Sequence, residues 1–245
     1  MRKSIWPALI ISCVLHSFVF AQAARPDNTS VNTALQNTID FYYASIGENA
    51  HLYIGSEHTG YNTSVTGHPY LDTTEMQIGS IFCSGILYKN IPLLYDIAND
   101  EIIINKYKQS YLISLPHEKI GFFSIRADTF VMVMPDTAAR NLPAAGFYNR
   151  IYNGKTLVLV KRKKILNEDP PANGASKFHY VQRNTYFVKK EKTYFRVTSK
   201  RSLFKLFDDK GKDIRRYLRK NKINFNDQPE YAIAQAARYY DSLTN

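Results

Sequence analysis

Residues that could bind a metal are concentrated in one loop-rich part of the chain, between residues 47 and 74. This group contains His51, Glu57, His58, His68 and Asp72. Two histidines and a carboxylate can hold a zinc ion and leave one position open for water. The spacing lacks the helical His-Glu-x-x-His pattern and the paired cysteines that make a zinc site recognisable. Polar loop residues therefore explain the group better, and we expect no metal and no cofactor.

Other residues with catalytic potential lack the neighbours that their chemistry needs. Carboxylate pairs for glycoside hydrolysis can be drawn from Asp72, Asp96, Asp100 and Glu101, but aspartate at Asn99-Asp100 also suits a turn. Cys83 lies in the strand-like segment GSIFCSG, which favours a buried apolar residue over a nucleophile. Gly-x-Ser-x-Gly and glycine-rich phosphate-binding motifs are absent. No catalytic residue is predicted; the alternative is a hydrolase whose site is assembled from dispersed loop residues.

Tyrosine is abundant, with 18 residues in the chain. Exposed tyrosines on a sheet can stack against glycans or peptides. Tyrosine is also a favoured strand residue, with an apolar ring and a hydroxyl that reaches water. We favour the second interpretation, and the candidates for the first are Tyr88, Tyr95, Tyr107, Tyr111, Tyr148 and Tyr152.

The strongest chemical signal is a basic stretch over residues 200–222, which holds ten lysines and arginines and three aspartates. A helix there would carry cations on one flank and Ile214, Tyr217 and Leu218 on the other. Such a helix can lie on an anionic membrane or bind phosphates, although a solvated helix face is the ordinary alternative. We expect it to form one positive surface with the basic run 161–164. The candidate anion-binding residues are Lys161, Arg162, Lys163, Lys164, Lys212, Arg215, Arg216, Arg219 and Lys220.

The charge of the chain is unevenly distributed. The net charge is +11, yet residues 24–134 hold 6 basic and 11 acidic residues, whereas residues 135–245 hold 24 basic and 10 acidic. Such asymmetry indicates an anionic partner for the basic half.

The N-terminus has the three parts of a secretory signal peptide over residues 1–23. Arg2 and Lys3 precede an apolar run, and Ala21-Gln22-Ala23 provides a cleavage site. The rival is a lipoprotein, acylated at Cys13. No later apolar run is long enough for a transmembrane helix. We expect an exported protein of the periplasm or the extracellular space, with association with the outer membrane as an open alternative. Its expected partners are an anionic lipid, a glycan or an envelope protein; nucleic acid is not expected, because no recognition motif appears.

The elements that would position these residues follow from periodicity. Spacings of three and four predict a helix over 28–46. Short runs rich in Ile, Leu, Tyr and Phe predict nine or ten antiparallel strands over 76–198, including a hairpin at Asn153-Gly154. Three helices are expected over 199–243, the first through Phe207 and the second capped by Asp208 or Asp209. The predicted fold class is α+β: an N-terminal helix, an antiparallel β meander forming a curved sheet or half-open barrel, and three C-terminal helices.

Seven strand residues are expected in the core: Leu94, Ile103, Leu112, Phe123, Val131, Leu157 and Leu159. The segments NIPLLYDIANDEIII, SKRSLFKLFDDKGKDIRRYLRKNKINF and YYDSL resemble an uncharacterised family of exported proteins of Gram-negative bacteria. The resemblance implies an exported chain with a single domain over 24–245 and supplies no activity and no catalytic residue. The sequence therefore favours a non-catalytic envelope protein that binds or scaffolds, through a basic C-terminal surface.

Overall fold

The computed structural model describes residues 33–35, 37–38, 41–42, 51–61, 64–106, 108–134, 143–169 and 177–244. The chain divides into two compact units, Met1–Tyr42 and Tyr43–Asn245, and the second carries the sheet and the C-terminal helices. The predicted signal peptide over 1–23 and the rival acylation at Cys13 lie outside the described residues.

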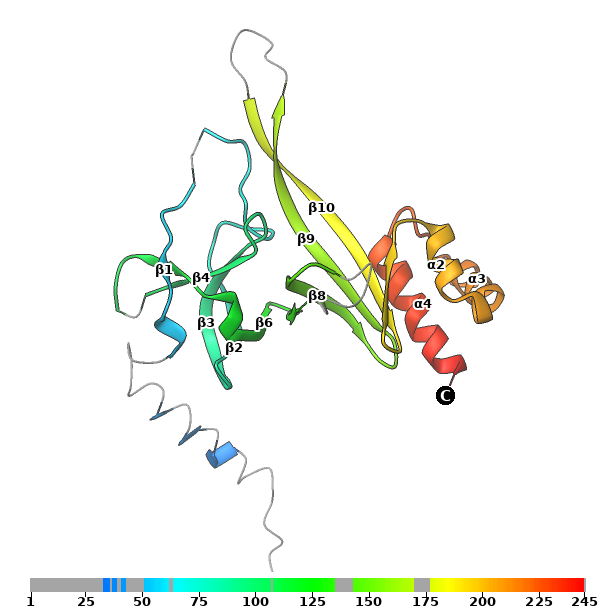
Figure 1. Cartoon of the computed structure of the whole chain (residues 1–245), viewed down its shortest axis with the longest axis horizontal. Coiled ribbons are helices and arrows are strands. Elements are labelled where there is room, and N and C mark those ends of the chain that lie inside the picture. The colour runs from blue at the N-terminus through cyan, green and yellow to red at the C-terminus, as the bar shows by residue number, and fades with distance from the viewer. Residues whose placement is uncertain are drawn as a thin grey trace, which may run out of the picture. The chain divides into compact units, whose positions relative to one another are not determined.

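One antiparallel sheet of eleven strands dominates the second unit (Figure 1), which confirms the predicted antiparallel pairing. The strand order is β1-β5-β4-β3-β2-β6-β7-β8-β9-β10-β11. The strands are β1 Ser56–Glu57, β2 Gln77–Cys83, β3 Ile86–Asp96, β4 Glu101–Asn105, β5 Leu112–Ser114, β6 Ile120–Ile125, β7 Asp128–Val133, β8 Gly146–Asn153, β9 Leu157–Asp169, β10 Lys177–Lys190 and β11 Thr193–Val197. From β2 the chain adds strands outward to β5, then returns to the other side of β2 and adds β6 to β11.

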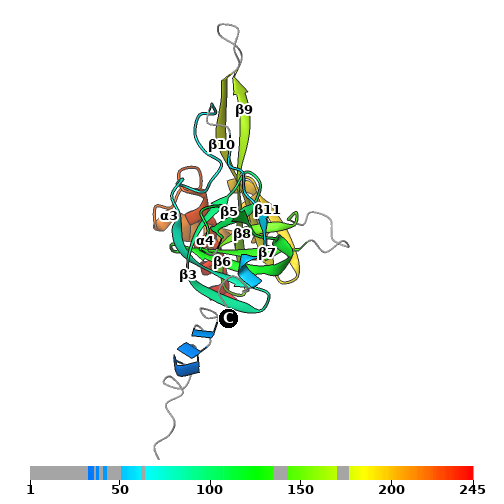
Figure 2. The same cartoon turned by 90° about the vertical axis from the view of Figure 1, so that its left-hand side faces the viewer.

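Strands β9 and β10 form the longest pairing of the sheet. Their register joins Lys177 to Asp169 at one end and Lys189 to Leu157 at the other. Figures 1 and 2 both show the two strands side by side and extending beyond their neighbours. Only the end next to β8 and β11 is covered on a face by the C-terminal helices.

The helices after the sheet are short. They are α2 Lys200–Leu206, the 3₁₀ turn η4 Asp208–Lys210, α3 Gly211–Lys220 and α4 Pro229–Leu243. Two further 3₁₀ turns are η2 His51–Tyr53 and η3 His117–Lys119. The bounds correct those expected from the sequence: α2 ends one residue before Phe207, and Asp208 and Asp209 belong to a 3₁₀ turn rather than capping a helix.

The predicted α+β fold class is wrong. The structure is mostly one eleven-stranded antiparallel sheet that is not closed, and the short helices do not define its class. The physical reason is that strand pairing reaches further than the sequence indicated. Strand β1, which precedes the predicted β region, adds to one edge of the sheet, and β9 and β10 pair over 13 positions. Of the helix expected over 28–46, only residues 33–35, 37–38 and 41–42 are described, so that helix is not shown.

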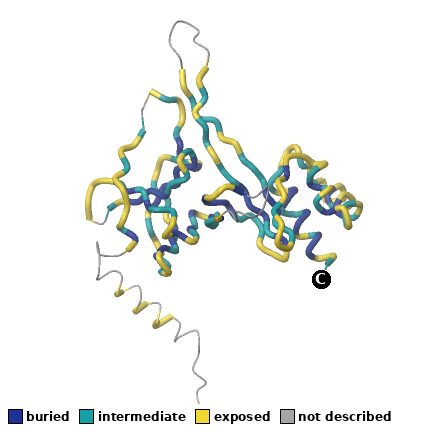
Figure 3. The backbone as a smooth tube through the Cα atoms, in the orientation of Figure 1, coloured by how far each residue is buried: buried dark blue, intermediate teal, exposed yellow. Residues whose placement is uncertain are grey.

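Three apolar clusters make up the core. The first joins strands β2 to β8 around Tyr95, Phe123, Phe130 and Phe147, with the rings of Phe123 and Phe130 stacked at 4.8 Å. The second packs α2, α3 and α4 against the ends of strands β9 to β11, and a small third cluster surrounds Tyr148 and Phe187. Figure 3 shows the buried residues gathered along the sheet and on the inner sides of the helices.

The predicted core residues are either buried or half-buried. Leu94, Ile103, Phe123 and Leu159 are buried, whereas Leu112, Val131 and Leu157 are half-buried. Cys83 is buried, with 1% of its surface exposed, and burial raises the pKa of its thiol. Because the thiolate is the reactive form, this supports the interpretation of Cys83 as a packing residue.

Of the five candidate tyrosines that the structure describes, Tyr111 alone is exposed. Tyr88, Tyr95 and Tyr148 are buried in the core, Tyr152 is half-buried and Tyr111 is exposed. Tyr107 lies outside the described residues. The strand-packing interpretation therefore fits the three buried tyrosines.

Candidate anion-binding clefts

Helix α2 is fixed at its start by a capping box. The Ser199 hydroxyl accepts a hydrogen bond from the Ser202 N–H at 3.2 Å, and the Ser202 hydroxyl accepts one from the Ser199 N–H at 2.9 Å. Leu203 and Phe207 are fully buried in the second cluster. These apolar anchors leave the basic side chains of α2 on its outer side.

Helix α3 is also anchored by buried apolar residues on one face. Ile214 and Leu218, four residues apart, are buried against α4 and α2. The five cations predicted on the opposite flank are all exposed: Lys212, Arg215, Arg216, Arg219 and Lys220. The basic flank expected from the sequence is therefore present on the described helix.

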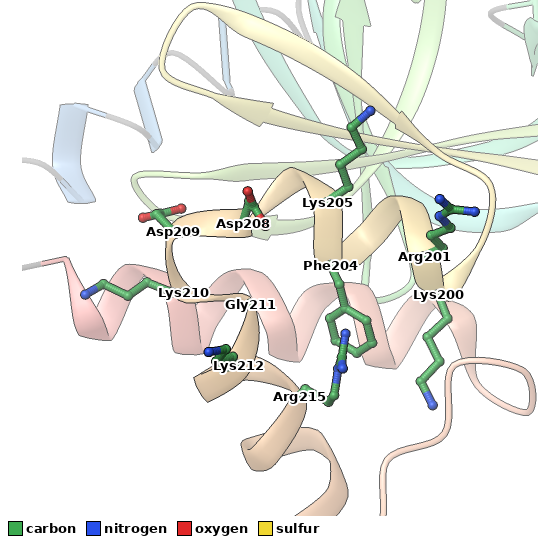
Figure 4. A pocket seen from close by; sticks show the side chains of 10 residues that line it. All are labelled: Lys200, Arg201, Phe204, Lys205, Asp208, Asp209, Lys210, Gly211, Lys212 and Arg215. Atoms are coloured by element: carbon green, nitrogen blue, oxygen red, sulfur yellow. The ribbon is translucent and has the colours of Figure 1, made fainter.

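An open cleft of about 1130 Å³ lies between α2 and α3, and we name it the α2–α3 cleft. Phe204 and Gly211 line it together with two carboxylates, Asp208 and Asp209 (Figure 4). Its cations outnumber these acids three to one: Lys200, Arg201, Lys205, Lys210, Lys212 and Arg215. The positive potential of so many cations around one concave surface favours anions there.

One of the two carboxylates is already neutralised from outside the cleft. Asp209 lies 3.1 Å from the Lys190 ammonium and accepts a hydrogen bond from the Tyr240 hydroxyl at 3.2 Å. Burial acts to raise the pKa of Asp209, but the hydrogen bond and charge of Lys190 outweigh it and lower that pKa. The six cations are therefore opposed mainly by the exposed Asp208.

Arg215 is the cation whose position is best defined. Its guanidinium lies over the Phe204 ring, 4.8 Å from the centroid, so one side chain from each helix meets across the cleft (Figure 4). Such stacking holds the planar guanidinium in place while its N–H groups stay available to an anion. A smaller cleft of about 380 Å³ shares Lys200, Phe204 and Arg215 and adds Arg219 and Lys222. The basic lining therefore continues around α3.

The basic run 161–164 on β9 behaves differently, because most of its charges bind groups inside the protein. The Lys161 ammonium lies 2.6 Å from Asp100 and donates to the Phe147 carbonyl at 3.1 Å. Burial lowers the pKa of Lys161, although Asp100 acts in the opposite direction. Arg162 binds both carboxylate oxygens of Glu230, each at 2.9 Å.

Lys164 and Lys163 complete the run. The Lys164 ammonium donates to the Tyr70 carbonyl at 2.6 Å, and burial lowers its pKa. Only Lys163 is exposed. Three of the four side chains therefore bind groups within the protein, and among the described residues no ion pair or hydrogen bond joins this run to α3. The single positive surface expected from the two segments stays a prediction.

Of the ten residues that line the α2–α3 cleft, only Lys212 and Arg215 were among the candidates chosen from the sequence. Phe204, Lys200, Arg201, Lys205 and Lys210 line it, but were not among the candidate residues. A signal existed: Phe204 is a large apolar residue outside the Leu203, Leu206 and Phe207 face of α2. Conversely, Arg216 and Lys220 are exposed on α3 without lining either cleft, and Arg216 lies 3.6 Å from Asp213.

The histidine-rich group near β1 does not form a metal site within the described part of the chain, where no three His, Cys, Asp or Glu side chains gather closely enough. His58 instead contacts two hydroxyls: its Nδ1 lies 3.4 Å from Ser114 Oγ and its Nε2 lies 3.4 Å from Tyr70 OH. Ser114 donates to Glu101 at 2.8 Å. In a catalytic triad the histidine lies between serine and acid, so this order differs from one.

The candidate carboxylates for glycoside hydrolysis also have structural partners. Asp96 is fully buried and accepts the N–H groups of Ala98 and Asn99 at 2.8 and 3.0 Å, besides a bond from Tyr61. Asp100 is held by Lys161, Tyr95 and the Phe147 N–H. These bonds order the β3–β4 turn and the neighbouring strand β8.

Comparisons of the chain with protein-family models, with curated proteins and with solved structures found no match. Among the described helices, none has the length and apolar character needed to cross a membrane, as expected from the sequence.

Proposed function

We propose that this chain is a non-catalytic, exported envelope protein that binds anionic ligands in the α2–α3 cleft. The observation that carries the proposal is the cleft itself, where six cations surround a concave surface with two carboxylates, one of them bound to Lys190. Export to the periplasm or extracellular space remains the expectation drawn from residues 1–23.

The chemistry of the cleft favours phosphate-like groups. Arginine and lysine donate short, charge-assisted hydrogen bonds to anionic oxygens, and the stacked Arg215 offers a planar fork that suits two oxygens at once. Lipid headgroups and acidic glycans both carry such oxygens. The exposure of the cleft predicts an interaction that weakens steeply as salt rises.

The test compares two variants of helix α3, each of which loses two positive charges. In the cleft variant, Lys212 and Arg215 are changed to Gln; in the control variant, Arg216 and Lys220 are changed to Gln. All four side chains are exposed, so neither change disturbs the core. Binding of pyrophosphate, of phosphatidylglycerol vesicles and of phosphatidylcholine vesicles is measured at low and moderate salt.

We expect the wild-type chain to bind pyrophosphate and the phosphatidylglycerol vesicles but not the phosphatidylcholine vesicles. The cleft variant should bind about tenfold more weakly, since it loses two charge-assisted contacts, whereas the control variant should stay within about twofold. Equal weakening of both variants would show diffuse attraction to a charged helix and would remove the role of the cleft. No binding by the wild-type chain would overturn the proposed function.

A further inference from the structure

A third cleft, of about 590 Å³, lies between α2 and the last two strands, and we name it the aromatic cleft. Phe187 of β10, Tyr194 and Phe195 of β11, and Leu206 of α2 give it apolar walls. Its volume is within the range of about 300–1,000 Å³ typical of small-molecule sites. Apolar side chains therefore make up four of its seven lining residues.

The walls of the aromatic cleft are anchored on one side and open on the other. Phe187 is buried, and its ring meets Tyr148 edge-on at 5.8 Å, so this wall belongs to the third core cluster. Phe195, by contrast, leaves 39% of its surface in water. β11 is the last strand of the sheet, so no further strand covers this edge within the described chain. An exposed apolar side chain that lines a concave surface with other apolar residues marks a binding site more often than a single apolar side chain elsewhere on the surface does.

Cations connect the aromatic cleft to the α2–α3 cleft. Lys205 lines both, and Arg196 adds a second cation to the aromatic cleft. In Figure 4 the Lys205 side chain leaves α2 on the side opposite to the Phe204 ring. An apolar cavity bordered by cations and adjoining a basic cleft is complementary to a molecule with an apolar chain and an anionic end.

We infer that the ligand is a single-chain anionic lipid whose acyl chain enters the aromatic cleft while its phosphate binds Lys205 and the α2–α3 cleft. The inference rests on the proposed function, because the phosphate site is the one described there. It goes further in naming an amphiphile over an acidic glycan, since a glycan would leave the aromatic cleft without an apolar occupant.

The test compares ligands that share a headgroup or a chain. Binding to the full-length chain is measured by calorimetry for myristoyl lysophosphatidic acid below its micelle concentration, for glycerol phosphate, and for monomyristoylglycerol. The variant is Phe195→Ser, and the matched control is Phe178→Ser, on β10 outside the three clefts described above. Phe178 leaves 37% of its surface exposed, and neither change alters charge. Circular dichroism confirms that both variants are folded.

We expect the lysolipid to bind at least tenfold more tightly than glycerol phosphate, because its chain removes apolar surface from water. Phe195→Ser should abolish most of that difference without changing glycerol phosphate binding, and Phe178→Ser should retain it. Equal affinity for lysolipid and glycerol phosphate, or equal effects of the two variants, would overturn the lipid inference and leave the anion site intact. Failure of both phosphate ligands to bind would overturn the proposed function as well.

Discussion

At the scale of single residues, the decisive difference is between cations with partners inside the protein and cations without them. Lys161 and Arg162 reach Asp100 and Glu230, acids that are 61 and 68 positions away in the sequence. Arg215 and Lys212 have no ion pair among the described residues and line a cleft instead. A cation in an ion pair inside the protein stays with its partner, because breaking the pair would leave a buried charge uncompensated. It is therefore not free to bind a ligand.

The Asp209–Lys190 pair predicts a specific pH dependence of stability. The pKa of Asp209 is lowered, so its contribution is full above its ordinary value of 3.8 and is lost as pH falls through its folded value. Although burial acts against it, contacts with Tyr240 and Asp209 raise the pKa of Lys190; that contribution is full below 10.5 and is lost at higher pH. Neutral pH lies inside both windows.

Asp209→Asn should therefore lower the free energy of unfolding at pH 7 by less than about 1 kcal/mol, because water screens the half-exposed carboxylate. The difference between wild type and variant should shrink towards zero as pH falls below the ordinary pKa of aspartate. Urea unfolding at several pH values measures this. A difference that persists unchanged in acid would mean that the side chain acts through packing and not through its charge.

Sequence reasoning identified the exposed cations of α3 correctly but could not separate them from the occupied cations of β9. Charge runs are visible in a sequence, whereas the partners of Lys161, Arg162 and Lys164 come from the β3–β4 turn, α4 and the loop before β2. Those contacts depend on which strands become neighbours. The basic stretch 200–222 marked this part of the chain in the sequence, and Phe204, outside the buried face of α2, was a further sign of the cleft.

At the scale of elements, α4 fixes the turn between β8 and β9. The buried Asp241 accepts the Thr156 N–H at 3.0 Å and the Tyr152 hydroxyl at 2.9 Å. A Cβ at Gly154 would lie 2.4 Å from both Asp241 Oδ2 and Tyr152 OH. The hairpin expected at Asn153-Gly154 is therefore present, and its glycine is needed for the close approach of the helix.

Gly154→Ala should consequently destabilise the protein by about 2 kcal/mol, because the added methyl group must displace a buried carboxylate from its hydrogen bonds. Gly121→Ala on β6 is the matched control, since a Cβ there meets only the edge of the Phe82 ring. Thermal unfolding of both variants measures the difference. An equal or larger loss at Gly121 would contradict the role of α4 in holding the turn.

Local sequence patterns predicted the single strands and hairpins better than they predicted how the strands are arranged in the sheet. Period-two runs located the antiparallel strands, since alternating burial requires alternating residue types. Leu112, Val131 and Leu157 were expected in the core and are half-buried, because their neighbours Ile113, Phe130 and Val158 are the residues that are fully covered. A shift of one residue moves a strand's side chains to the opposite face.

At the scale of the whole molecule, the predicted α+β class was wrong because periodicity predicts single helices and strands. It does not predict the order of the strands in a sheet or how much of the fold each element makes up. The return of β6 to the free side of β2 leaves one open sheet ending in β11. That edge lies next to α2, so the aromatic cleft and the α2–α3 cleft occupy the two sides of one short helix. The position of β11 at the end of the sheet thus determines where the two clefts lie.

We propose that anions bind in the α2–α3 cleft and not over the basic surface in general. Titration of isotope-labelled protein with pyrophosphate, followed through backbone amide resonances, tests it most directly. We expect saturable changes in amide chemical shift that are concentrated in residues 200–215. Residues 161–164 should change little, because Lys161, Arg162 and Lys164 already bind groups within the protein. Shifts spread evenly over the exposed lysines and arginines, or none at all, would contradict it.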